Sequence, residues 1–257
     1  MPVHEVAASG FDREADVYER SRPSYPPEAV AWLEAQLRIG RGRRVLDLAA
    51  GTGKLTRLLA PLGSTLLAIE PVAGMSAHLR ATTPGVPVAA GTAEALPLAT
   101  GSLDAIVVAQ AFHWFDGPAA LAEAHRCLVP GGWLGLIWNA RDRSADHVDR
   151  LWSIMDRIER RAPWRNHEEW RDSAVFLDAP GFSPMIEATF RHEQHLSPDD
   201  VVARFQSVSH VAVLPEAERE AVLDEVRTVL ATHPDTRGRD TITIPYRVDA
   251  FACERRA

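Results

Sequence analysis

The segment VLDLAAGTGKL, residues 45 to 55, combines an acid with two closely spaced glycines at the end of an apolar run. Asp47 stands inside the apolar run, and Gly51 and Gly53 follow it. Glycine lets a backbone approach a ligand closely, so this spacing is typical of a turn that carries a cofactor. The residues around the glycines decide which cofactor the turn accommodates.

Two phosphate-binding turns are excluded by those residues. A Walker A loop requires glycine at position 48 and serine or threonine at position 55, where the chain has Leu48 and Leu55. A dinucleotide turn of the form G-x-G-x-x-G requires a third glycine, where the chain has Thr56. Asp47 would repel a pyrophosphate, whereas it would attract a cofactor that carries an amine.

Around this turn the chain alternates between helical and buried strand-like segments, which predicts a mostly parallel sheet with helices on both faces. We expect the strand at 103–112 to be the longest buried one, and a Pro-Gly-Gly turn at 130–132 to lead into a strand at 133–139. The other predicted strands are 43–50, 64–71 and a short strand with a loop over 86–97, and the predicted helices are 26–37, 54–63, 73–82 and 117–128.

Beyond residue 140 the pattern changes. A charged helical stretch over 143–164 indicates an insertion or cap, and the segments 185–196 and 241–256 alternate as strands do. Helices are expected between them at 197–208 and 215–230, with Ser197 and Pro215 marking their starts. We therefore divide the chain into a lid segment (1–27), a cofactor-binding core (28–140), a helical cap or insertion (141–182) and a C-terminal completion of the sheet (183–257).

With these landmarks in order, the sequence resembles the class I S-adenosylmethionine-dependent methyltransferases of the small-molecule type, such as the methyltransferase type 11 and trans-aconitate methyltransferase-like enzymes. The resemblance is dense over residues 43 to 138. It is carried by the D-x-A-x-G-x-G turn, GTAEALPL at 91–98, AQAFHWFD at 109–116 and LVPGGWLGLI at 128–137. The family commonly has D-x-G-x-G-x-G, so Ala49 is a departure.

The resemblance implies an α/β fold with a doubly wound, Rossmann-like sheet of seven strands, mostly parallel with the last strand antiparallel, an N-terminal helical lid and a small cap. It implies S-adenosyl-L-methionine as cofactor, S-adenosyl-L-homocysteine as product, and no metal. Glu70 would accept hydrogen bonds from the ribose hydroxyls, and Thr92 replaces the usual aspartate at the adenine edge. The full set of residues expected at the cofactor is Tyr18, Arg22, Asp47, Ala49, Gly51, Gly53, Glu70, Met75, Thr92, Ala93, Glu94, Ala109 and Gln110.

On the acceptor side the resemblance places His113 and Trp114 at the substrate, together with Phe11 and Tyr25 of the lid. Methyl transfer from a sulfonium is an in-line displacement, so the enzyme chiefly positions the acceptor. A carboxylate needs only positioning, whereas a hydroxyl or an enolic carbon would benefit from His113 as catalytic base. The alternative is that His113 is an ordinary loop histidine and the aromatic residues are core packing.

Three other functions stay open at this point. The departures at Ala49 and Thr92 are compatible with a protein that binds S-adenosylmethionine without catalysis, or with a cofactor-bound enzyme of non-methylating chemistry. An NAD-dependent oxidoreductase on a similar sheet is disfavoured by the missing third glycine.

Composition sets the remaining expectations. A net charge of −7 argues against a nucleic-acid partner, and we expect a small-molecule methyl acceptor instead. Neither a membrane-spanning run nor a secretory signal is visible, so we expect a cytoplasmic protein, as a monomer or homodimer. Cys127 and Cys253 show no metal or disulfide pattern, and His192 and His195 would point to opposite faces of a strand.

Overall fold

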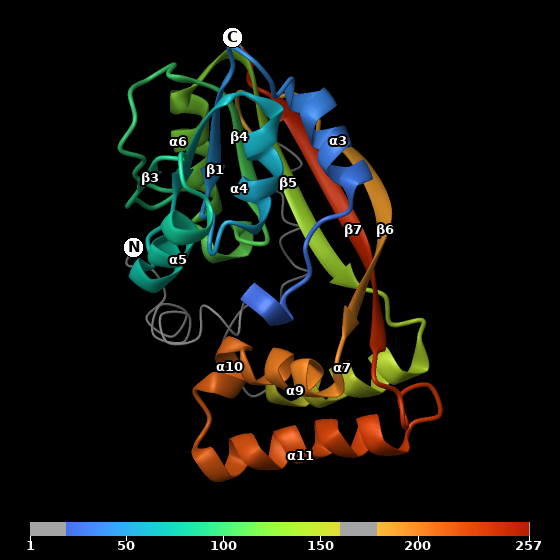
Figure 1. Ribbon diagram of the computed structural model, residues 1–257. Helices are drawn as coiled ribbons and strands as arrows, with labels where there is room; N and C mark the ends of the chain where they lie inside the picture. The colour runs from blue at the N-terminus through green and yellow to red at the C-terminus, as the bar shows by residue number, and fades with distance from the viewer. Residues whose placement is uncertain (1–18, 160–178, 257) are drawn as a thin grey trace.

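The computed structural model describes residues 19–159 and 179–256, so Phe11 and Tyr18 lie outside the described residues. Within these ranges seven strands form one sheet in the order β3-β2-β1-β4-β5-β7-β6 (Figure 1). Strands β1 to β5 pair in parallel, and β7 runs antiparallel to both β5 and β6. The predicted fold class is therefore confirmed. The strands are β1 Arg44–Leu48, β2 Thr65–Ile69, β3 Val88–Ala89, β4 Leu103–Ala109, β5 Leu128–Arg141, β6 Ile186–Leu196 and β7 Ile242–Glu254.

Two expectations about strand length and turns were wrong in detail. Strand β4 has 7 residues, whereas β5 has 14 and β7 has 13, because these two continue past the parallel part of the sheet as an antiparallel pair. The Pro-Gly-Gly segment at 130–132 is not a separate turn before a strand. It lies inside β5, where the pairing with β4 shifts register, and Gly131 takes a φ of 77° there.

Helices cover both faces of the sheet because the strand residues alternate between two apolar clusters. In β4, Ala105 and Val107 pack with the face covered by α3 (Pro27–Leu37) and α4 (Lys54–Leu59), whereas Ile106 and Val108 pack with the face covered by α6 (Gly117–Cys127). The other elements around the sheet are two short 3-10 helices, η1 (Ala60–Leu62) and η2 (Phe112–Trp114), and α5 (Ala73–Thr82).

A helical layer lies beyond the carboxyl ends of the parallel strands, with the helical turn at 19–21 between it and the sheet (Figure 1). It has its own apolar core, which includes Trp152, Phe205 and Leu223. Helices of the predicted cap (141–182) and of the predicted C-terminal segment (183–257) therefore share one core. Ser197 caps α9 as predicted, since its side chain accepts a hydrogen bond from the Asp200 N–H. The layer consists of α7 (Asp146–Glu159), α9 (Pro198–Gln206), α10 (Ser209–Ala212) and α11 (Glu216–Thr232).

The two neighbouring strands β1 and β4 end in strained backbone. Ala49 follows β1 with a φ of 55°, and Gln110 follows β4 with a φ of 60°. Side chains other than glycine rarely adopt this left-handed conformation, and such strain collects at functional sites. In the sheet, β2 lies on one side of β1 and β4 lies on the other, so the strand order reverses between β1 and β4. The two strained residues follow the strands at this reversal.

We predict that Ala49→Gly stabilises the protein by about 1 kcal/mol, because glycine has no Cβ to strain a positive φ. In a chain of this size the melting temperature should rise by roughly 2–4 °C, measured by calorimetry. Ala50→Gly is the matched control. Ala50 has no positive φ, so glycine there should cost about 0.5–1 kcal/mol. Equal losses in both variants would show that Ala49 is not strained.

Candidate active site

Asp47 is a fully buried acid beneath the glycine turn, with 0% of its surface exposed. One carboxylate oxygen, Oδ2, accepts a hydrogen bond of 2.6 Å from the Thr56 hydroxyl. Its other oxygen, Oδ1, has no hydrogen-bond partner in the described part of the chain. Burial raises the pKa of Asp47 to about 7, and the nearby Glu70 adds to that rise while Thr56 opposes it. A buried acceptor held in this way favours a cationic or hydrogen-donating ligand.

Glu70 ties the glycine turn to the end of β2. Its two carboxylate oxygens accept hydrogen bonds from the Gly51 N–H at 2.8 Å and from the Val72 N–H at 2.9 Å. The side chain is 4% exposed, and burial raises its pKa above the ordinary value. Each oxygen retains a second lone pair, so contact with ribose hydroxyls stays a prediction compatible with this arrangement.

The rest of the glycine turn is closely packed. Gly53 directly precedes α4 with a φ of 87°, and a Cβ at that position would lie 2.2 Å from a Leu79 methyl carbon. Met75 is buried, and its sulfur lies 3.8 Å from where a Cβ on Gly51 would stand. Met75 therefore borders the turn, and its contact with the cofactor's adenine stays a prediction.

The loop predicted at the adenine is joined to the segment predicted at the acceptor. The Glu94 carboxylate accepts a hydrogen bond of 2.9 Å from the Asp116 N–H, just after η2. Ala93 is 3% exposed and belongs to the core, and Thr92 pairs with Ala95 across the loop. Glu94 thus fixes one loop against the other.

His113 and Trp114 lie beyond the end of β4, as expected from the sequence. Their rings are 4.8 Å apart, and the His113 ring is 6.3 Å from that of Trp138 in β5. Trp114 is 40% exposed, which is unusual for so large an apolar side chain. Ala109 closes β4, and the Gln110 N–H donates to the Ile137 carbonyl at 3.0 Å. A half-buried histidine close to two tryptophans therefore lies at the carboxyl edge of the sheet.

Two residues of the N-terminal segment contact different parts of the structure. Arg22 donates to the Ser207 carbonyl at 3.3 Å, which places its guanidinium at the end of α9. Tyr25 is 7% exposed and packs in the apolar cluster under α3. The structure therefore brings Arg22 toward the helical layer and Tyr25 into the core, whereas the residues from Asp47 to Gln110 gather around the strand ends.

Glu19 is a residue of this region that the sequence did not single out. It accepts a hydrogen bond of 2.6 Å from the Thr52 hydroxyl, pairs with Lys54 at 3.2 Å and also pairs with Arg57. Burial lowers the pKa of Lys54, and the Glu19 charge opposes that fall. No local pattern marks Glu19, because its partner Thr52 stands 33 positions further along the chain.

The residues present fit a cofactor with an amine and no phosphate. The orphaned Asp47 Oδ1 provides a buried acceptor, and no described cation occupies it. Within the described ranges no three His, Cys, Asp or Glu side chains are grouped so that they could hold a metal ion. No helix in those ranges is long and apolar enough to cross a membrane.

We predict a pH-dependent difference between wild type and Asp47→Asn. The raised pKa means that the unfolded chain loses this proton near pH 4 while the folded protein keeps it, so Asp47 lowers stability as pH rises from about 4 to 7. The asparagine variant should match wild type near pH 4 and exceed it by on the order of 2–4 kcal/mol at pH 8, measured by urea unfolding.

Asp104 is the matched control, because it is a buried acid on the neighbouring strand with the opposite shift. The Arg44 side chain holds the pKa of Asp104 below its ordinary value, so its contribution to stability is present above pH 4 and is lost on acidification. Asp104→Asn should therefore be less stable than wild type by a constant amount between pH 5 and 8. A constant difference for Asp47→Asn as well would contradict the account.

Comparison with known proteins relates the chain to a family. The methyltransferase-domain family matches residues 46–136, which run from β1 into β5. An uncharacterized methyltransferase of Mycobacterium bovis is 39% identical over 236 residues, covering 92% of this chain and 91% of the relative. An uncharacterized methyltransferase-like protein of Schizosaccharomyces pombe is 32% identical over 254 residues, covering 98% of each.

Among solved structures, a putative type II methyltransferase from Anaeromyxobacter dehalogenans has the same fold, with a TM-score of 0.63 and 22% identity over 91% of this chain and 97% of that one. The fold, the buried acid beneath the glycine turn and the relatives that span nearly the whole chain agree. The chain belongs to the class I S-adenosylmethionine-dependent methyltransferases.

Proposed function

We propose that the protein transfers a methyl group from S-adenosylmethionine to a small-molecule acceptor by in-line displacement. The observation that supports this best is the buried Asp47 carboxyl, which offers an unfilled acceptor beneath a glycine turn. It lies where the two strained strand ends meet at the reversal of the strand order. A cofactor with an amine and no phosphate suits that position.

The chain's own residues would divide the work as follows. S-adenosylmethionine supplies, when bound, a methyl group already activated by the sulfonium. Asp47 binds the positive end of the cofactor, and Glu70 holds the Gly51 backbone that borders it. Trp114, which is 40% exposed beside His113, would contact the acceptor.

His113 determines which acceptors are handled well. A carboxylate is nucleophilic at neutral pH and needs only positioning, whereas a hydroxyl or enolic carbon must lose a proton. The His113 ring lies 4.8 Å from that of Trp114 and 6.3 Å from that of Trp138, beyond the end of β4. We therefore propose His113 as the base for hydroxyl or enolic acceptors.

The direct test is incubation of the protein with isotopically methyl-labelled S-adenosylmethionine and a panel of carboxylate, hydroxyl and enolic acceptors, followed by mass spectrometry. We expect at least one labelled product together with S-adenosylhomocysteine. Tight cofactor binding without product from any acceptor would instead favour a binding protein without catalysis.

We also predict that His113→Ala lowers kcat for a hydroxyl or enolic acceptor by about 10²–10⁴-fold and leaves cofactor affinity unchanged. The control is His195→Ala, because the His195 side chain is 58% exposed on β6. Full turnover by His113→Ala with such an acceptor would remove the proposed role.

A further inference from the structure

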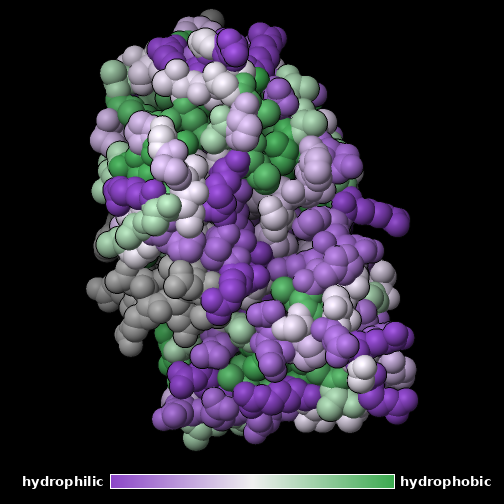
Figure 2. Space-filling view, viewed as in Figure 1, coloured by the Kyte–Doolittle hydropathy of each residue, from purple (hydrophilic) through white to green (hydrophobic). Residues whose placement is uncertain are grey.

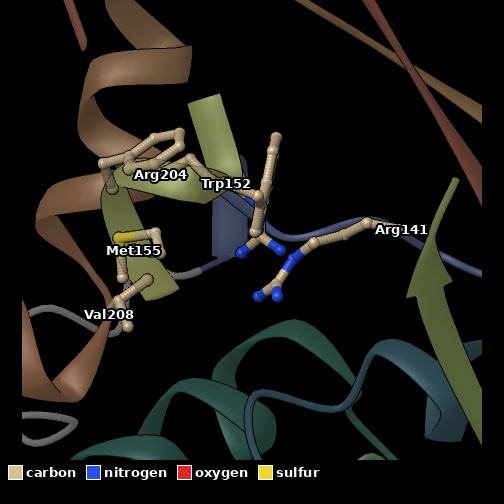
Figure 3. Close-up of a pocket in the computed structure, with 6 residues that line it drawn as sticks. Arg141, Trp152, Met155, Arg204 and Val208 are labelled. Carbon is tan, nitrogen blue, oxygen red and sulfur yellow. The ribbon is translucent and has the colours of Figure 1, made fainter. Parts of the chain in front are cut away.

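A small cavity lies where the end of β5 meets the helical layer. About 150 Å³ of space lies between its walls, but this space opens to solvent and part of it is solvent volume. A pocket for a whole small molecule usually measures about 300–1,000 Å³, so this shallow site could contact only one chemical group of a ligand, held at its open side. It is lined by Arg141, Trp152, Met155, Arg204, Phe205 and Val208 (Figure 3).

Arg204 is a buried cation without a counter-ion in the described part of the chain. It is 4% exposed, and its Nε and Nη1 atoms are buried without a hydrogen-bond partner there. An arginine stays protonated in a protein, and a buried charge is costly unless it is paired. An anion beside this side chain would therefore be stabilising. It stands on the buried face of α9 beside Val201 and Phe205, where an apolar residue is the ordinary choice.

Three acidic residues of α7 and α9 are engaged with other groups. Asp149 and Asp156 of α7 both pair with Arg143, each at 2.8 Å. The Asp200 carboxylate accepts a hydrogen bond of 2.7 Å from the Ser197 hydroxyl at the start of α9. The described contacts of these three acids therefore do not neutralise Arg204.

A second guanidinium reaches the same cavity from the sheet. The Arg141 guanidinium carbon lies 5.0 Å from the centre of the Trp152 ring. Figure 3 shows the guanidinium groups of Arg141 and Arg204 approaching the same space from opposite sides, beside Trp152. An anion at this place would have a charge-assisted contact with each of the two guanidinium groups.

The cavity adjoins the site proposed for methyl transfer. Burial lowers the pKa of Lys54, which follows the glycine turn directly, and the Arg204 charge adds a smaller part to that fall. Arg141 stands three residues after Trp138 on β5, so it lies roughly 10 Å further along the strand than the tryptophan that neighbours His113. Hydrophilic side chains gather along the junction of the sheet and the helical layer on the face seen in Figure 2.

We propose that this cavity binds a negatively charged group of the methyl acceptor, a carboxylate or a phosphate, between Arg204 and Arg141 with Trp152 as its wall. The inference rests on the proposed function and narrows its acceptor to an anionic small molecule. The bound group is distinct from the atom that is methylated at His113.

The binding test uses malonate and inorganic phosphate as probes in thermal unfolding, at constant ionic strength and with malonamide as the neutral comparison. Malonate or phosphate should raise the melting temperature of wild type, and malonamide should not. Arg204→Met should lose this response, with an apparent affinity at least tenfold weaker, and should itself melt no lower than wild type without anion, because it removes an uncompensated charge. The larger of the two responses distinguishes a carboxylate site from a phosphate site.

Two further variants control this test. Arg204→Lys keeps the charge without the planar fork, so we expect a response between those of wild type and Arg204→Met. Arg150→Met removes an arginine from α7 that is 61% exposed and pairs with Asp146, so its response should equal that of wild type. Equal anion responses in wild type and Arg204→Met would overturn the inference.

The labelled-methyl assay separates this inference from the proposed function. Methylation of anionic acceptors with a KM at least tenfold higher in Arg204→Met supports both. Methylation of neutral acceptors alone, unaffected by Arg204→Met, overturns the anion site and leaves methyl transfer intact. An Arg204-dependent anion response without any methyl transfer supports the anion site and contradicts the proposed function.

Discussion

The structure of the site depends on the burial of one carboxyl group, that of Asp47 near the end of β1. The residue lies in β1, one of the central strands of the sheet, and its carboxylate accepts a hydrogen bond from the Thr56 hydroxyl. The chain leaves β1 above it through left-handed backbone at Ala49, Gly51 and Gly53. Glu70 then fixes that turn through the Gly51 N–H. An acid that resists ionisation until a partner arrives is the central feature of the site.

The periodicity of the sequence predicted most of the sheet, because buried strands alternating with helices permit few other arrangements. The glycine turn, Glu70 and the His113 segment were also predictable, since each follows directly from the end of a strand. The lengths of β5 and β7 were not, because they depend on pairing between segments more than a hundred residues apart. The burial of Tyr25 and the ion pairs of Glu19 likewise arise from long-range packing.

A charged residue on the apolar face of a helix can indicate a binding site, and the helical layer contains such a residue. Arg204 interrupts the stripe of α9, a signal that the sequence already contained, although its meaning depended on Arg141 arriving from β5. The chain carries a net charge of −7, yet cations collect at the junction of the sheet and this layer. Local charge of this kind, rather than the net value, selects a ligand. The basic residues concerned are Arg22, Lys54, Arg57, Arg141 and Arg204.

The central claim is that Asp47 ionises to receive the positive end of S-adenosylmethionine. Calorimetric titration of the cofactor at pH 6, in buffers of different ionisation enthalpy, measures the protons exchanged on binding. Since the pKa of Asp47 is raised to about 7, wild type should release close to one proton more per bound cofactor than Asp47→Asn, and the difference should vanish above about pH 8. Equal proton exchange by the two proteins at pH 6 would contradict the account.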